Sequence, residues 1–224
     1  MTTQQMAQSR LRLLPVLVLL ASAATLAAAG EGKFNILHIN ADDHRADGLH
    51  ALGNEVLKTP NLDKLVEQGM TFTHCYTMGS MIGAVCLPSR TMLLTGRSWL
   101  RVLGRMNPQG KAMDSAAVLP RVLSAAGYTT FYVGKSGNEY KAGIDAFDTN
   151  IVMDDRTPEL RRGSSERHAD ATIKFLKERI KDKPFYIYFA PPVPHDPRVT
   201  APEFHSVSSP GPASPRAGAW HLSI

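Results

Sequence analysis

The sequence lacks an apolar run of the ~20 residues that a membrane-spanning helix needs. Its N-terminal apolar run, Leu13 to Leu20, is broken by Pro15 and fades into alanines. Arg10 and Arg12 precede this run, and the small residues 27–29 follow it. This order of basic, apolar and small residues predicts a secretory signal peptide at residues 1–29. We therefore expect a periplasmic or secreted protein that is not attached to a membrane after cleavage.

The sequence is also poor in cysteine and has no Asn-x-Ser/Thr triplet. Its two cysteines, Cys75 and Cys86, allow one disulfide, which is the plain structural reading of a cysteine pair in an exported chain. A single disulfide that closes a short loop would add little stability to a domain of this size, so this pairing is not favoured. Without a glycosylation sequon, the sequence favours a bacterial periplasmic or secreted protein over a glycosylated lysosomal one.

A large charge excess is absent as well. Removing Arg10 and Arg12 with the signal peptide leaves 23 basic and 20 acidic residues, a net charge of +3. This mild surplus argues against a dedicated nucleic-acid-binding protein, which would present a clustered basic face. The surplus is compatible with an anionic substrate.

Residues 30–205 are long enough for one α/β domain with a sizeable core. Strands are predicted at residues 34–40, 70–76, 128–133 and 184–190, and helices at residues 59–69, 89–95, 116–126 and 164–180. The last helix places Ala169, Ile173, Leu176 and Ile180 on one apolar stripe. Residues 144–162 have no such pattern and are predicted to be a solvated loop.

Polar residues follow the carboxyl ends of three predicted strands. Asp42 and Asp43 follow the first strand, Lys135 follows the strand at 128–133, and His195 follows the strand at 184–190. Ligands of open α/β sheets bind outside these strand ends, so the adjacent acids are candidate metal ligands. Considered alone, the two acids also fit a solvated turn or a helix cap, and an isolated histidine is more often a surface residue.

Cys86 stands just before the helix predicted at 89–95, which Gly96 ends as a left-handed cap. Free backbone N–H groups and the helix dipole favour an anion at such an N-terminus. Cys75 lies between His74 and Tyr76 and is predicted to be a buried or half-buried structural thiol. A zinc site at His74 and Cys75 would lack the paired ligand spacing that makes such sites specific.

The segment Cys86-Leu87-Pro88-Ser89-Arg90, followed by Thr95-Gly96-Arg97, resembles the sulfatase family. The pair Asp42-Asp43 and the segment 59–65, Thr-Pro-Asn-Leu-Asp-Lys-Leu, strengthen the resemblance, which extends over about residues 34–202. It implies an α/β fold of the alkaline-phosphatase type: a mixed, mostly parallel sheet flanked by helices, here incomplete at the C-terminus. Residues 30–205 would be the N-terminal part of the catalytic domain.

The resemblance also implies a hydrolase of sulfate monoesters. Cys86 would be oxidised to formylglycine (3-oxoalanine), and one hydroxyl of its hydrate would attack sulfur while the other later expels sulfate. Asp42, Asp43 and the modified residue 86 would hold Ca²⁺ or Mg²⁺, which acts as Lewis acid and template. Arg90 would anchor the modified residue, Lys135 would bind sulfate oxygens, and His195 would act at the leaving oxygen or in substrate binding.

Ligand chemistry gives an independent reason to expect this conversion, because a thiolate is a soft ligand that is poorly matched to Ca²⁺, whereas a hydroxyl oxygen matches it. The implied partners are a sulfated small molecule or polysaccharide and a formylglycine-generating enzyme or equivalent maturase.

The sequence departs from the family pattern at two places. Sulfatases continue the Gly-Lys of residues 134–135 with Trp-His, whereas this chain has Ser136-Gly137, so the family's histidine is replaced by Gly137. Nothing after His195 resembles the family's second acidic pair or its second lysine. Residues 206–224 contain no acidic residue and no periodicity, and are predicted to be a disordered or out-of-frame tail. Impaired activity is therefore expected for this chain.

Two other functions are compatible with the sequence. The first is a phosphatase or phosphodiesterase of the alkaline-phosphatase superfamily. Those enzymes usually use Thr or Ser as nucleophile, so the Cys86 motif favours sulfate. The second is a non-catalytic exported fragment.

Overall fold

The computed structural model describes residues 32–76, 78–79, 85–102, 118–137, 140–155, 157, 160 and 163–195. The predicted signal peptide at 1–29 and the predicted tail at 206–224 lie outside these residues. The chain divides into two units after Phe34. All helices and strands described below belong to the second unit, and residues 32–34 of the first form neither.

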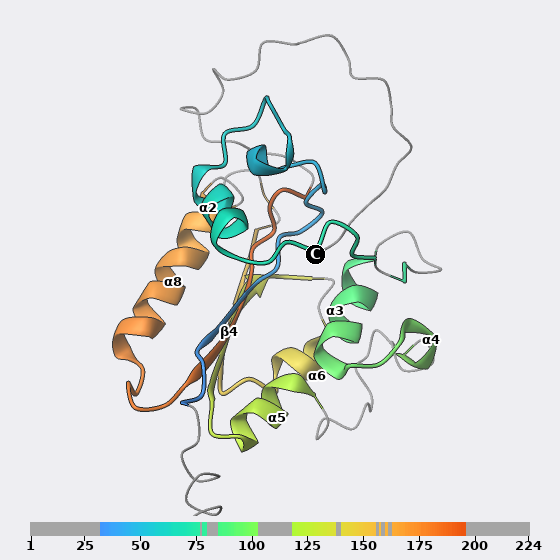
Figure 1. Ribbon diagram of the computed structural model, residues 1–224. Coiled ribbons are helices and arrows are strands. Elements are labelled where there is room, and N and C mark those ends of the chain that lie inside the picture. Colours follow the sequence, from blue (N-terminus) through green and yellow to red (C-terminus); the bar gives the residue numbers. More distant parts are fainter. Residues whose placement is uncertain are drawn as a thin grey trace, which may run out of the picture. The chain divides into compact units, whose positions relative to one another are not determined.

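The second unit is built on a four-stranded parallel sheet with the order β1-β4-β2-β3 (Figure 1). The strands are β1 (Ile36–Ile39), β2 (Thr129–Lys135), β3 (Thr149–Met153) and β4 (Phe185–Ala190). In the register, Phe189 of β4 pairs with Ile39 of β1 on one side and with Val133 of β2 on the other. Because the strands are parallel and nearly in register, their carboxyl ends meet at one edge of the sheet.

Helices cover both faces of this sheet. The described helices are α2 (Pro60–Gln68), α3 (Cys86–Thr95), α4 (Trp99–Val102), α5 (Leu119–Ala125), α6 (Lys141–Ile144) and α8 (Ser164–Glu178), with a 3₁₀ helix η1 (His50–Leu52). Figure 1 shows α8 on one side of the sheet and α3, α5 and α6 on the other. This arrangement confirms the predicted fold class, a mostly parallel sheet flanked by helices.

The alternation of side chains along the central strands produces two hydrophobic clusters. Tyr186 and Tyr188 of β4 point to the α3 and α6 side, where they pack with Leu94 and Ile144. Ile187 points to the opposite side and joins a cluster that includes Phe131, Val133, Phe175 and Leu176. The rings of Phe131 and Phe175 are stacked with centroids 4.3 Å apart. A strand buried on both faces is typical of the centre of a parallel sheet.

Two predictions of secondary structure were wrong. Residues 70–76 alternate like a strand but are irregular, and Met70, Phe72 and Tyr76 are exposed. A strand needs a hydrogen-bonding neighbour, and residues 70–76 pair with no described strand. Residues 144–162, predicted to be a loop, contain β3, which is stabilised by its pairing with β2.

The predicted helices are present, but their bounds differ from the prediction, and the buried face of α8 is not the predicted one. Helix α3 begins at Cys86 itself, and Pro120 lies in the first turn of α5, a position that proline tolerates. The apolar stripe predicted for α8 was placed wrongly, because Ile173 is exposed. The buried face instead contains the polar His168 and Thr172.

Within the described residues, none of the helices has both the length and the apolar character required to cross a membrane.

The contrast between the two isoleucines provides a stability test. Ile187 is fully buried in β4, whereas Ile173 on α8 is 46% exposed. We expect Ile187→Ala to lower the free energy of unfolding by about 2–5 kcal/mol, because it removes buried apolar surface and leaves a cavity. Ile173→Ala should change it by no more than about 0.5 kcal/mol. Urea unfolding followed by circular dichroism measures both, and equal losses would contradict the assignment of the core.

Candidate active site

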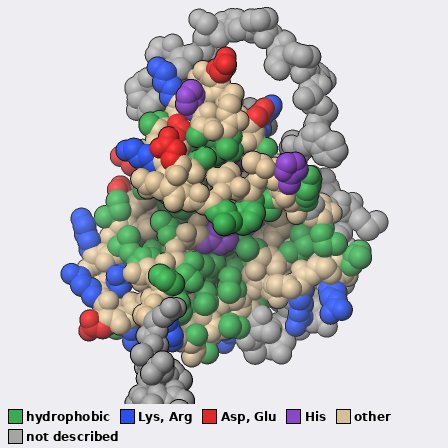
Figure 2. All heavy atoms as spheres, in the orientation of Figure 1, with side chains coloured by type: hydrophobic (Ala, Val, Ile, Leu, Met, Phe, Trp, Pro, Cys, Tyr) green, Lys and Arg blue, Asp and Glu red, His purple; other side chains and the backbone are tan. Residues whose placement is uncertain are grey.

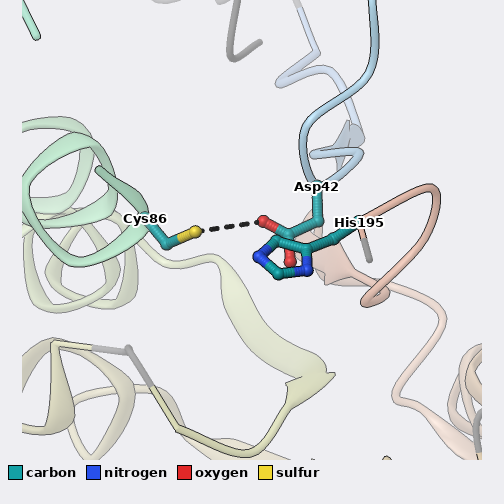
Figure 3. Close-up of side chains that lie close together, drawn as sticks. All are labelled: Asp42, Cys86 and His195. Carbon is teal, nitrogen blue, oxygen red and sulfur yellow. Dashed lines mark hydrogen bonds between the residues drawn. The ribbon is translucent and has the colours of Figure 1, made fainter. Parts of the chain in front are cut away.

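The polar residues predicted from the sequence converge at the carboxyl edge of the sheet. Asp42 follows β1, Lys135 is the last residue of β2, and His195 follows β4. Helix α3 reaches the same place with its N-terminal end, which carries Cys86 as its first residue and Arg90 one turn later. Figure 3 shows Asp42, Cys86 and His195 facing one another from three separate segments.

A backbone link between the extensions of β1 and β4 places Asp42. Its N–H donates to the carbonyl oxygen of Val193 at 3.1 Å, and Asp42 forms a parallel β-bridge with Pro194. The pairing of β1 with β4 therefore continues beyond both strands. As a result, His195 is held next to Asp42 although the two residues are far apart in the sequence.

The carboxylate of Asp42 is 3% exposed and is surrounded by donors. Lys135 forms an ion pair with Oδ2, and the Arg90 guanidinium lies 3.3 Å from Oδ1. All three side chains are buried. A buried carboxylate is tolerated only when such partners offset its loss of hydration, so these contacts determine where the three side chains lie.

Cys86 is the first residue of α3 and lies against this charged cluster. Its Sγ is 3.4 Å from Oδ1 of Asp42 and 3.7 Å from Nζ of Lys135. Burial raises the pKa of the Cys86 thiol and the nearby Asp42 carboxylate raises it further, while Lys135 opposes both effects. The thiol is thus protonated at neutral pH and donates to Asp42, so this cysteine is not an activated thiolate nucleophile.

Asp43 takes a different direction from Asp42. Its backbone has a left-handed φ of 58°, and its side chain is 41% exposed. Its Oδ2 lies 3.5 Å from Nε2 of His195. Within the described residues, the group that could hold a metal ion consists of Asp42, Cys86 and His195, whose ligand atoms lie within 4.8 Å of one another. Asp43 borders this group through His195, and its role as a ligand stays a prediction.

The donor set fits a hard divalent cation only in part. The carboxylates offer the oxygen ligands that Ca²⁺ and Mg²⁺ prefer, but the Cys86 sulfur does not. Lys135 also occupies Oδ2 of Asp42 and would have to give way. An oxygen substituent in place of the thiol would remove the mismatch. The residues present therefore fit such a metal once residue 86 carries oxygen.

Several neighbours of the site were not identified from the sequence. The buried side-chain amide of Asn40 donates to the Tyr188 hydroxyl at 2.7 Å, which anchors the end of β1 two residues before Asp42. The half-buried His38 lies on the same strand, and burial and the Arg90 charge lower its pKa, so it is neutral at pH 7. The contact of Asn40 with Tyr188 has no local sequence signal, because it depends on the pairing of β1 with β4.

The remaining predictions for this region have mixed outcomes. Cys75 and Cys86 are both free thiols, so the less favoured disulfide is not formed. The prediction that Cys75 is buried or half-buried was wrong, because this thiol is exposed. Gly96 has a left-handed φ of 62° and ends α3, as predicted. Gly137, which stands where the family has a histidine, also has a left-handed φ, 78°.

The environments of the two cysteines predict different reactivity in protein whose Cys86 is still a thiol. Exposed Cys75 should react with iodoacetamide at pH 8 faster than buried Cys86, whose pKa is raised. Asp42→Asn removes a carboxylate that raises this pKa, after burial the second cause, while Lys135 remains, so the alkylation rate of Cys86 should rise. Peptide mass spectrometry measures both rates. Asp47→Asn, which changes an exposed carboxylate paired with Arg45, is the matched control. A slower Cys86 in Asp42→Asn would contradict the assigned contact.

Two sulfatases illustrate the similarity to known proteins. The chain is 27% identical over 222 residues to an N-acetylglucosamine-6-O-sulfatase of Bacteroides thetaiotaomicron, covering 90% of this chain and 39% of the relative. It is 42% identical over 122 residues to arylsulfatase A of Bos taurus, covering 52% of this chain and 23% of the relative. The chain thus spans less than half the length of these relatives.

A solved structure, of a protein in complex with its substrate D-glucosamine-2-N,6-O-disulfate, has the same fold. It superposes with a TM-score of 0.54 and 23% sequence identity, and the match covers 73% of this chain and 35% of that one. The sulfatase family model matches residues 34–212, which include every residue of the site. On the strength of this match over most of its length, the chain belongs to the sulfatase family.

Proposed function

We propose that this chain carries part of the active site of a sulfuric ester hydrolase that cleaves sulfate monoesters. The observation that supports this most directly is the placement of Cys86 at the N-terminus of α3, in contact with Asp42 and Lys135. In a member of the sulfatase family, this cysteine is the residue we expect to be converted to formylglycine. Export, predicted from residues 1–29, and a maturase in the producing cell belong to the same proposal.

The buried cations and the helix N-terminus suit a sulfate ester, which is an anion. Lys135 and Arg90 are 6% and 2% exposed, so water screens their charges weakly. The first N–H groups of α3 have no partner within the helix and add a positive partial charge beside Cys86. Together these groups can bind sulfate oxygens and stabilise the charge that develops on them during attack at sulfur.

The proposed hydrolysis needs two further groups, formylglycine at residue 86 and a divalent metal ion. Formylglycine supplies, as its hydrate, the hydroxyl that attacks sulfur. A bound Ca²⁺ or Mg²⁺ supplies Lewis acidity, with Asp42, Asp43 and the oxygen of residue 86 as the ligands we propose. The Lys135 ammonium group pairs with Asp42 in the structure. With Asp42 as a metal ligand, this ammonium group would be available to bind a sulfate oxygen.

His195 is the residue best suited to the leaving group. It lies at the rim of the site, 33% exposed, whereas Asp42 and Lys135 are buried. A histidine in this position can hold a proton for the oxygen that leaves as the sulfur–oxygen bond breaks. The carboxylate of Asp43 lies 3.5 Å from Nε2 and can orient the ring.

A sulfated saccharide is the substrate class we favour. The Bacteroides thetaiotaomicron relative is named for a 6-O-sulfated N-acetylglucosamine, and the structural neighbour binds a disulfated glucosamine. The phosphatase and phosphodiesterase alternative is not favoured, because both of the relatives described above are sulfatases.

The conversion of Cys86 can be measured directly. When the chain is produced with a formylglycine-generating enzyme, mass spectrometry should find an aldehyde in place of the thiol at residue 86, and an aminooxy probe should label that residue. Cys75 is exposed but lacks the Pro-Ser-Arg context, so it serves as the internal control and should stay a thiol. A Cys86 thiol that persists in a competent host would rule out the proposed nucleophile.

The proposed role of Lys135 can be tested by kinetics on a longer version of the protein that turns over aryl sulfates, since we expect little turnover from residues 1–224 alone. There, kcat/KM should be higher for an aryl sulfate than for the matched aryl phosphate. Lys135→Ala should lower kcat/KM for the sulfate by ~10²–10³-fold, because it removes a buried charge that stabilises the transition state. Lys141→Ala, which removes an exposed lysine paired with Asp145, is the control and should have no effect. Equal losses in the two variants would contradict the assignment.

A further inference from the structure

The metal-binding group of the site offers three different kinds of ligand atom. Asp42 offers a carboxylate oxygen, Cys86 a sulfur and His195 a ring nitrogen, and these atoms lie within 4.8 Å of one another. Ca²⁺ and Mg²⁺ prefer oxygen ligands, whereas Zn²⁺ is bound in proteins by Cys sulfur, His nitrogen and carboxylate oxygen. As long as residue 86 carries a thiol, the ligand set therefore matches Zn²⁺ better than it matches either hard cation.

The spacing of the sulfur and the carboxylate oxygen also suits zinc. Bonds of about 2.3 Å to sulfur and about 2.0 Å to oxygen separate these two ligand atoms by about 3.5 Å in a tetrahedral site. In the structure, Sγ of Cys86 lies 3.4 Å from Oδ1 of Asp42. A zinc ion can therefore replace the thiol proton between the two atoms with little movement of either, and the proton is released to solvent.

The charges around this position permit a metal ion. Zinc needs only Oδ1 of Asp42, so Lys135 can keep its ion pair with Oδ2. The Lys135 ammonium group also lies 3.7 Å from Sγ, where it stabilises a thiolate. Lys135 and Arg90 repel a cation, but the thiolate and the carboxylates of Asp42 and Asp43 outnumber these two positive groups.

His195 supplies the ligand at the rim of the site. Figure 3 shows its imidazole beside the Asp42 carboxylate, close to Cys86. Its side chain is partly exposed, whereas Asp42 and Cys86 are buried, so water can take the fourth tetrahedral position from the exposed side. The Asp43 carboxylate next to Nε2 can orient this ring, as carboxylates do for metal-bound histidines.

We propose that the thiol form of this chain binds Zn²⁺ through Cys86, Asp42 and His195, and that an oxygen in place of the sulfur abolishes this preference. The ion held at the site then distinguishes an unconverted chain from one whose residue 86 carries oxygen. The competing thiol site is the exposed pair His74 and Cys75. The proposal concerns the unconverted chain and does not rest on sulfate hydrolysis.

Metal titration can test this proposal on the chain produced without a formylglycine-generating enzyme, after mass spectrometry has verified the thiol at residue 86. The probes are Zn²⁺, Ca²⁺ and Co²⁺, each added alone. We expect Zn²⁺ to bind more tightly than Ca²⁺ in calorimetry. Co²⁺, which occupies zinc sites and absorbs visible light, should give the sulfur-to-metal charge-transfer absorption that identifies a cysteine ligand.

Substitutions of the two cysteines form a matched pair. Cys86→Ser should lower the Zn²⁺ affinity at least ~100-fold, because losing a group that merely orients a ligand already costs ~10–100-fold. This variant should also lose the charge-transfer absorption, while its affinity for Ca²⁺ should not fall. Cys75→Ser removes the exposed thiol outside the group and should bind Zn²⁺ as tightly as the parent chain.

His195→Ala provides a second variant that changes only the rim of the site. It should weaken Zn²⁺ binding at least ~10-fold and keep the charge-transfer absorption of bound Co²⁺, because the sulfur ligand remains. Melting temperatures without metal show which variants keep the fold. If Cys86→Ser unfolds, the decision rests on His195→Ala and Cys75→Ser.

Three outcomes would overturn the proposal. One is unchanged Zn²⁺ affinity in a folded Cys86→Ser variant, and another is unchanged affinity in His195→Ala. The third is loss of Zn²⁺ binding and of the charge-transfer absorption in Cys75→Ser, which would assign the ion to His74 and Cys75. None of these outcomes bears on the proposed hydrolase, whose nucleophile is tested by the conversion of Cys86.

Discussion

One buried carboxylate, that of Asp42, holds the site together. Its oxygens contact Lys135 from β2 and Arg90 from α3, and its backbone continues the pairing of β1 with β4. Lys135 is itself buried and depends on this carboxylate for its charge partner. The cluster therefore fixes two strand ends and the first turn of a helix relative to one another. It also collects positive charge at the place where an anionic ester would bind.

The parallel topology explains why residues so distant in sequence can meet. Asp42 and Lys135 are 93 residues apart, yet each follows or ends a strand at the same edge of the sheet. Crossover connections return the chain to the opposite edge after every strand, so each new strand delivers another loop to this edge. The catalytic chemistry of the proposed hydrolase is thus distributed over loops, while the sheet beneath them provides the rigid support.

Much of this arrangement could be predicted from local patterns, and the rest depends on contacts that no local pattern reveals. The β-rich runs correctly predicted β1, β2 and β4, and Gly96 correctly predicted the end of α3. The short β3 is visible only through its pairing with β2, and the buried face of α8 was missed because His168 and Thr172 are polar. The Nδ1 of His168 and the hydroxyl of Thr172 contact carbonyl oxygens one turn away in the same helix. The proximity of His195 to Asp42 results from a β-bridge beyond the strand ends, and neither this bridge nor the left-handed backbone of Asp43 has a local sequence signal.

Gly137 replaces the family's histidine at a position where the backbone is left-handed. Apart from the glycine itself and its two chain neighbours, nothing lies within 4 Å of the position that a Cβ would take there, so a Cβ would meet no steric clash. The left-handed φ of 78°, however, is one that residues with a Cβ rarely adopt. Restoring the family's histidine would therefore place a side chain on a backbone conformation that glycine adopts more readily.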